Sequence, residues 1–199
     1  MNALLYRAHN KIPGFKLREK KTSSLMWFVY IASLMFLWNR RFMTSYITTI
    51  GTTVYVPCRV DEFGLMYGDL VVLKHEIQHM LDSLEEGVVL WSVKYLFPQV
   101  LAPLCLLGFA WWPLWFLALA LLPWPAPWRV RAEVRGYAVT AFEWWKQGSQ
   151  TKTSTLCDSY RKYFTGWAYY KMAWRWNPVR RALVARVEEL RKADKSVNG

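Results

Sequence analysis

Long apolar runs alternate along the chain with shorter, charged segments. Residues 25–38 are apolar apart from Ser33, and we predict a helix there. Its 14 residues would rise only about 21 Å, which favours a buried or half-inserted helix over one that crosses a bilayer. Residues 69–86 carry enough apolar surface for a second helix, with Asp69 as its N-cap and Gly87 as its C-terminal stop.

Residues 46–57 form the one segment with a clear strand pattern. β-Branched and aromatic residues dominate it, Gly51-Thr52 interrupts it and Pro57 ends it. We expect either two short strands in a hairpin or one bent strand. Such a strand could pair with an extended peptide, or it could be purely structural.

Residues 88–124 form the longest apolar run, in which Lys94 is the only charged residue. Four prolines and Gly108 argue against one continuous helix, so we predict a hairpin of two short helices, 88–106 and 109–122. Its tryptophans are typical of a membrane interface. The alternative is that this run forms the core of a compact soluble protein.

The C-terminal part, residues 126–195, is predicted to be helical and basic. A first helix over 126–147 is followed by a polar loop, Ser149–Cys157. Asp158 would cap a helix that runs to about Arg175. Asn177 and Pro178 would begin a last helix that ends near Lys192.

Composition suggests a single domain, 1–199, with a mostly helical α+β fold. The chain combines 13 tryptophans and 54% hydrophobic residues with a net charge of +12, which points first to membrane lipid and second to nucleic acid. Residues 1–24 hold six Lys or Arg against one Glu, so they form either a basic N-terminal arm on anionic lipid or a solvated extension.

The cysteines and the N-terminal sequence argue against a disulfide framework and against a cleaved signal peptide. Cys58, Cys105 and Cys157 are widely spaced and odd in number, so we interpret them as reduced packing residues. The apolar run after the basic arm lacks a small-residue cleavage site, and we therefore expect no cleaved signal peptide.

The candidate chemistry lies in the sequence His75-Glu76-Ile77-Gln78-His79, which has the form H-E-x-x-H. On a helix both imidazoles reach one ion, and Glu76 lies roughly 100° around the axis, beside the open position of the metal. This spacing suits Zn²⁺ and a general base. The alternative is a chance match, against which two of the three histidines of the chain fall within the motif.

A catalytic zinc site needs a third protein ligand. Glu85 lies six residues after His79, but on a continuous helix it points about 240° away, so we exclude it. Glu133 is the better candidate because it is a carboxylate near the start of a later helix, separated from His79 by the apolar run.

With this ligand set the chain resembles the gluzincin metallopeptidases, in which a glutamate from a later helix completes the H-E-x-x-H site. It is most similar to small membrane-associated members encoded by phages and bacteria. The matching elements lie in order over residues 46–140: Thr48-Thr49-Ile50-Gly51, Tyr55-Val56-Pro57, His75 to His79, and Glu133 followed by Tyr137-Ala138.

The resemblance implies a hydrolase in which His75, His79 and Glu133 ligate zinc and Glu76 is the general base. One position departs from the pattern. Thermolysin-like enzymes carry an aspartate four residues after the ligating glutamate to orient a histidine, and this chain has Tyr137 there. Asp82 or Tyr137 would have to take over that outer role.

The apolar run constrains how the site could be placed in a membrane. If Glu133 and the histidines share one ion, residues 88–124 must begin and end on the same side of the membrane. A hairpin does so, and a single span does not. Residues 128–199 hold 15 of the 26 Lys and Arg, which places the zinc site on the cytoplasmic face.

Three functions follow, of which the first is the leading hypothesis. It is a membrane-associated zinc endopeptidase that hydrolyses a protein or peptide substrate. The second is a structural or membrane-interacting protein of a virion or envelope, with a non-catalytic zinc site. The third, nucleic-acid binding by the basic C-terminal helices, is disfavoured because basic helices beside a membrane more often contact lipid headgroups.

Overall fold

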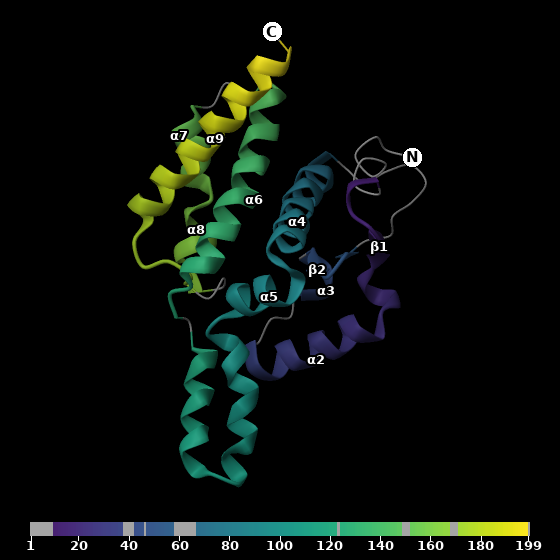
Figure 1. Cartoon of the computed structure of the whole chain (residues 1–199), viewed down its shortest axis with the longest axis vertical. Helices are drawn as coiled ribbons and strands as arrows, with labels where there is room; N and C mark the ends of the chain where they lie inside the picture. Colours follow the sequence, from purple (N-terminus) through teal and green to yellow (C-terminus); the bar gives the residue numbers. More distant parts are fainter. Residues whose placement is uncertain are drawn as a thin grey trace. The chain divides into compact units, whose positions relative to one another are not determined.

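The structure is a computed structural model that describes residues 10–37, 42–45, 47–57, 67–122, 124–148, 152–167 and 171–198. Residues 1–9 of the expected basic arm and Cys58 lie outside the described residues. The chain is mostly helical with one small sheet, as the predicted α+β class requires (Figure 1). It divides into two compact units, Met1–Leu81 and Asp82–Gly199.

The first unit contains a three-stranded sheet. β2 (Thr48–Ile50) and β3 (Thr53–Val56) are antiparallel, with Thr49 opposite Val54. The turn between them is at Gly51, whose φ is 58°, so the hairpin is confirmed over a single bent strand. β1 (Lys16–Glu19) pairs in parallel with β3.

β1 is an element that the sequence did not predict, because it lies within the basic segment 1–24. Its side chains alternate between exposed and half-buried positions, so charged residues occupy the exposed face. Just before it, Ile12 and Phe15 are buried in the same core as Val54 and Val56. The expectation of a single β segment was therefore wrong.

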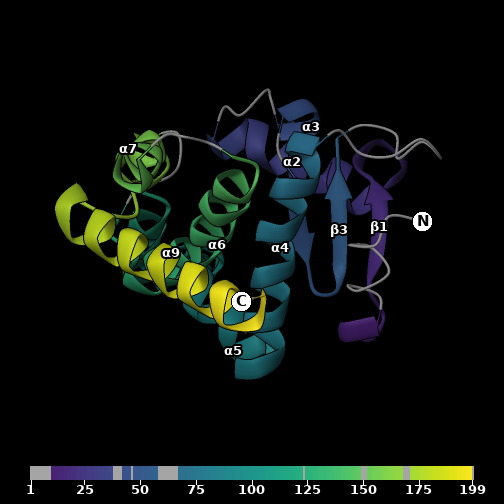
Figure 2. The same ribbon diagram turned by 90° about the horizontal axis from the view of Figure 1, so that it is seen from above.

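Helices pack around this sheet. A 3-10 turn (η1, Lys20–Thr22) leads into α2 (Ser24–Leu37), which confirms the predicted apolar helix, and α3 (Phe42–Ser45) precedes the hairpin. α4 (Tyr67–Glu86) lies along the sheet beside β3 (Figure 2). Its buried Leu73 and Met80 belong to the same core as Val54 and Val56.

The bounds of α4 differ from the prediction at one end. The helix includes Tyr67, so Asp69 lies within its first turn and is not the N-cap. At the other end it stops at Glu86, and Gly87 has a φ of 89°, a conformation that glycine adopts without strain. The predicted glycine stop is thus confirmed.

The second unit begins with the apolar run, which is divided differently from the prediction. α5 (Val88–Leu96) is a separate short helix. It is followed by the 3-10 helices η2 (Gln99–Phe109) and η3 (Trp112–Leu121), which pack side by side as a hairpin (Figure 1). Pro98 separates α5 from η2, so the predicted helix 88–106 was wrong and the hairpin spans 99–121.

Within the described part of the chain, no single helix combines the length and apolarity that a membrane span requires. α5 and η2 meet these criteria of length and composition only as a pair, and the two are bent by 99° at their junction.

The C-terminal helices form the core of the second unit. α6 (Pro127–Lys146) packs along α9 (Trp176–Asn198), as both views show (Figures 1 and 2). The buried side chains that join them to their neighbours include Ala138, Phe164, Leu183 and Val187. Cys157 is buried here, and burial raises the pKa of its thiol to about 11, as suits a packing residue.

The predicted polar loop Ser149–Cys157 and the helix after it were both wrong, because α7 (Thr153–Ser159) begins within that loop. α7 contains Asp158, and α8 (Arg161–Thr165) ends at Gly166, so no helix runs from Asp158 to Arg175. The Asp158 carboxylate accepts hydrogen bonds from Trp176 Nε1 at 2.9 Å and Arg180 Nε at 2.8 Å. These bonds tie it to α9, which is a different role from the predicted N-cap.

Candidate metal centre

His75 and His79 lie one turn apart on α4 and face each other. Their Nε2 atoms are 3.0 Å apart and their rings meet edge to face at 83°. Both side chains are buried, with 7% and 5% of their surface exposed. The i, i+4 spacing thus places two nitrogen donors at one point, as the motif predicted.

Glu76, the next residue on α4, lies against the sheet. It is half-buried, and its Oε2 accepts a hydrogen bond of 2.6 Å from Thr49 Oγ1 on β2. The hairpin therefore holds one oxygen of the carboxylate.

A buried cation, Lys20, interacts electrostatically with Glu76. Lys20 Nζ donates a hydrogen bond of 2.8 Å to the Phe42 carbonyl oxygen and lies 3.7 Å from the centre of the Phe42 ring. Burial lowers the pKa of Lys20 to about 8, although attraction to Glu76 partly opposes that shift.

Glu133 lies on α6 and is also buried, with 8% of its surface exposed. Its Oε1 accepts a short hydrogen bond from the Tyr95 hydroxyl on α5. Tyr95 is itself held in place, because Arg129 Nε donates to its carbonyl oxygen at 2.9 Å and Trp91 stacks on its ring. The position of this carboxylate is thus fixed by Tyr95 of α5, which Arg129 of α6 holds in turn.

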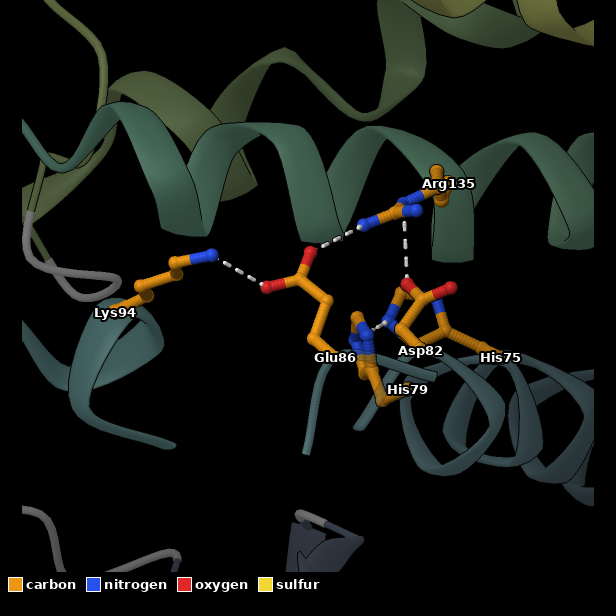
Figure 3. A network of polar contacts seen from close by, with 6 residues as sticks. All are labelled: His75, His79, Asp82, Glu86, Lys94 and Arg135. Carbon is orange, nitrogen blue, oxygen red and sulfur yellow. Dashed lines mark hydrogen bonds and ion pairs between the residues drawn. The ribbon is translucent and has the colours of Figure 1, made fainter. Parts of the chain in front are cut away.

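The end of α4 is connected to α6 by ion pairs within the second unit (Figure 3). Arg135 Nε on α6 lies 3.1 Å from Asp82 Oδ2, and Arg135 Nη2 lies 3.8 Å from Glu86 Oε1. Lys94 Nζ lies 2.8 Å from Glu86 Oε2, and this hydrogen bond lowers the pKa of Glu86. Because α4 is continuous through Leu81 and Asp82, Asp82 lies about one turn and Glu86 about two turns beyond His79 on the same helix.

His75, His79 and Glu133 form a buried group that could hold a metal ion. Each offers one ligand atom, and these atoms all lie within 4.8 Å of one another. Glu85 is exposed on α4 and is not in this group.

Family models, curated proteins and solved structures were all compared with the chain, and none of them matches it.

The two predicted outer partners have well-defined surroundings. Asp82 is buried and pairs with Arg135. Tyr137 is half-buried, and its ring stacks on Tyr163, with Tyr160 and Phe164 nearby. The idea that either residue orients a ligating histidine stays a prediction.

Sequence reasoning missed the residues that hold the two glutamates, above all Tyr95 and Lys20. Thr49 was noted only as part of a strand. The one available signal for Tyr95, the partner of Glu133 on α5, was that Lys94 and Tyr95 interrupt an otherwise apolar run. Lys20 gave no signal, because one lysine in a basic segment does not stand out.

Proposed function

We propose that the chain is a zinc-dependent endopeptidase that works at a membrane surface. The observation that carries the proposal is the buried group of His75, His79 and Glu133, with Glu76 adjacent in sequence. Two imidazoles and one carboxylate form a donor set that catalytic zinc sites use, with a fourth position left for water or substrate.

The spacing of the histidines is compatible with zinc. Two nitrogens bound to one tetrahedral ion at about 2.0–2.1 Å would be roughly 3.3 Å apart, and the Nε2 atoms are 3.0 Å apart. Two buried imidazoles at this distance need either a shared proton or a shared cation between them. A cation also balances the buried Glu133 carboxylate.

When bound, zinc would polarise the scissile carbonyl and lower the pKa of a coordinated water toward about 7. Glu76 then accepts a proton from the attacking water and delivers it to the leaving amine. Thr49 keeps the carboxylate in place by its bond to Oε2. Tyr95 orients Glu133 and so sets the geometry of the ligand group.

The η2–η3 hairpin supports the membrane part of the proposal. Residues 99–121 contain no charged side chain, and large apolar side chains are exposed along them, including Phe109 at 84%, Trp112 at 68% and Phe116 at 63%. Exposed apolar surface of this kind marks an interaction site, and tryptophans favour the lipid interface. The basic C-terminal part then favours a cytoplasmic location for the zinc site.

A second candidate is a structural zinc site in a membrane-interacting protein, such as a virion or envelope component. The observation in its favour is the burial of all three donors, which would hold a zinc ion away from solvent. The two candidates differ in one respect. Only the peptidase needs the Glu76 carboxylate.

The test combines metal analysis with peptide cleavage. Wild-type protein should contain one zinc per chain and cleave a quenched peptide library, and Glu76→Gln should keep the zinc while its cleavage rate falls by about 100-fold or more. Glu85→Gln, an exposed glutamate on the same helix, is the matched control and should keep both zinc and activity.

Four results would decide against the proposed peptidase mechanism. Zinc-loaded wild type that cleaves nothing would favour the structural site, and a Glu76→Gln variant as active as wild type would exclude Glu76 as the general base. Absence of zinc from wild type, or zinc content that His79→Ala leaves unchanged, would exclude both candidates.

A further inference from the structure

A pocket of about 110 Å³ lies within the second unit, between one face of α5 and one face of α6. α5 contributes Trp91, Lys94 and Tyr95, which are spaced i, i+3, i+4 and therefore share one side of the helix. α6 contributes Trp128, Arg131 and Arg135, with the same kind of spacing. Ala132 of α6 and Glu86, at the end of α4, complete the lining.

The lining is cationic. It carries Lys94, Arg131 and Arg135 against a single carboxylate, Glu86. Glu86 already forms ion pairs with Lys94, at 2.8 Å from Nζ, and with Arg135, at 3.8 Å from Nη2. Arg135 also pairs with Asp82. Arg131 is exposed and has no ion pair among the residues that the structure describes. The pocket thus offers one guanidinium to an incoming anion.

The shape and walls of the pocket favour a small organic anion. A guanidinium binds a carboxylate through two parallel hydrogen bonds, and such charged bonds are about twice as strong as neutral ones. Trp91 and Trp128 provide apolar surface for the carbon atoms that carry the anion. A volume of about 110 Å³ has room for a carboxylate and a few carbon atoms.

The pocket is next to Glu133, the predicted zinc ligand on α6. Tyr95 lines it and at the same time donates its hydroxyl hydrogen to Glu133. Ala132, which precedes Glu133 on α6, also lines it. A group bound in the pocket is therefore separated from a candidate zinc ligand by a single side chain.

We propose that this pocket binds a carboxylate of the peptide substrate, with Arg131 as the residue that selects it. The proposal rests on the proposed function. It implies that the chain prefers peptides with an acidic side chain or a free C-terminal carboxylate close to the scissile bond.

The experiment measures peptide binding to the zinc-loaded, full-length Glu76→Gln protein, so that no peptide is consumed. Three labelled peptides share one neutral sequence: one ends in an amide, one ends in a free carboxylate, and one ends in an amide but carries an internal glutamate. Fluorescence anisotropy gives the three Kd values. At least one carboxylate peptide should bind about tenfold or more tightly than the neutral one.

The deciding comparison adds a second substitution to that protein. Arg131→Gln should reduce the carboxylate preference to less than about twofold and leave the neutral peptide's Kd unchanged. Arg181→Gln removes the same charge at an exposed position of α9 and should keep the preference, which controls for general attraction to a chain of net charge +12.

The outcomes separate the two proposals. The inference is overturned if neither carboxylate peptide is preferred, or if the preference survives Arg131→Gln or is lost equally in Arg181→Gln. If the preference depends on Arg131 but zinc-loaded wild type cleaves neither these three peptides nor the quenched library, the pocket stands and the peptidase proposal fails. The carboxylate peptide that binds more tightly identifies the source of the anion.

Discussion

The surroundings of Glu76 on α4 and of Glu133 on α6 are alike in plan and different in detail. Each carboxylate accepts a hydrogen bond from a hydroxyl on another element, Thr49 on β2 or Tyr95 on α5. Glu133, however, is almost fully buried, and its tyrosine is anchored in turn by Arg129, whereas Glu76 is half-buried. Glu133 is therefore the more fixed of the two carboxylates and Glu76 the more accessible, which agrees with the proposed roles of ligand and general base.

Replacing each glutamate by glutamine should give the largest difference between the two positions, measured as zinc affinity. Glu133→Gln should weaken zinc binding by more than about 100-fold, beyond the roughly 10- to 100-fold that outer partners of a ligand contribute. Glu76→Gln should change it less than about threefold, because Glu76 is not a ligand. Competition with a zinc-binding dye measures both affinities, and equal effects in the two variants would contradict the assignment.

A smaller effect is expected from the tyrosine that holds Glu133. Tyr95→Phe removes the hydroxyl and keeps the ring stacked on Trp91, so zinc affinity should fall by about 10- to 100-fold while the protein stays folded. Tyr163→Phe, in the aromatic cluster of α8, is the matched control. Zinc affinity in Tyr95→Phe within about twofold of the control would show that the hydroxyl does not orient the ligand.

The buried cation near Glu76 predicts a pH dependence of stability. The pKa of Lys20 is about 8 in the folded chain, against an ordinary value of 10.5, so between these values the unfolded chain binds more protons and stability rises with pH. The free energy of unfolding of wild type minus that of Lys20→Met should therefore increase by roughly 1–3 kcal/mol from about pH 7 to about pH 10.

Urea denaturation at both pH values measures this difference. Lys21→Met changes the exposed neighbouring lysine and is the matched control. A difference between wild type and Lys20→Met that stays constant or falls over this range would mean that Lys20 is not buried as the structure places it.

Two features whose structure depends on residues close together in the sequence were predicted correctly. The hairpin β2–β3 followed from β-branched residues around Gly51, and the end of α4 from Gly87. β1 was missed because its stability comes from pairing with β3, 37 residues further on, and its exposed face is charged. α7 was missed because the segment from Thr153 is rich in Thr and Ser, a composition that favours a loop.

The candidate site shows the same division. The histidine pair follows from helical spacing alone, and Glu133 followed from its place on a later helix. Tyr95, Arg129 and Lys20 act through contacts between elements distant in the chain, such as the 38 residues that separate Tyr95 from Glu133. No spacing rule identifies such partners, so the ligands were predictable and their supports were not.

The central claim is that His75, His79 and Glu133 hold one zinc ion. Anomalous diffraction from crystals of the wild-type chain, recorded on both sides of the zinc absorption edge, tests it most directly. The account predicts a single peak about 2.0–2.2 Å from one atom of each of the three side chains. Zinc-loaded crystals with no peak there, or with a peak that Glu133 does not contact, would contradict it.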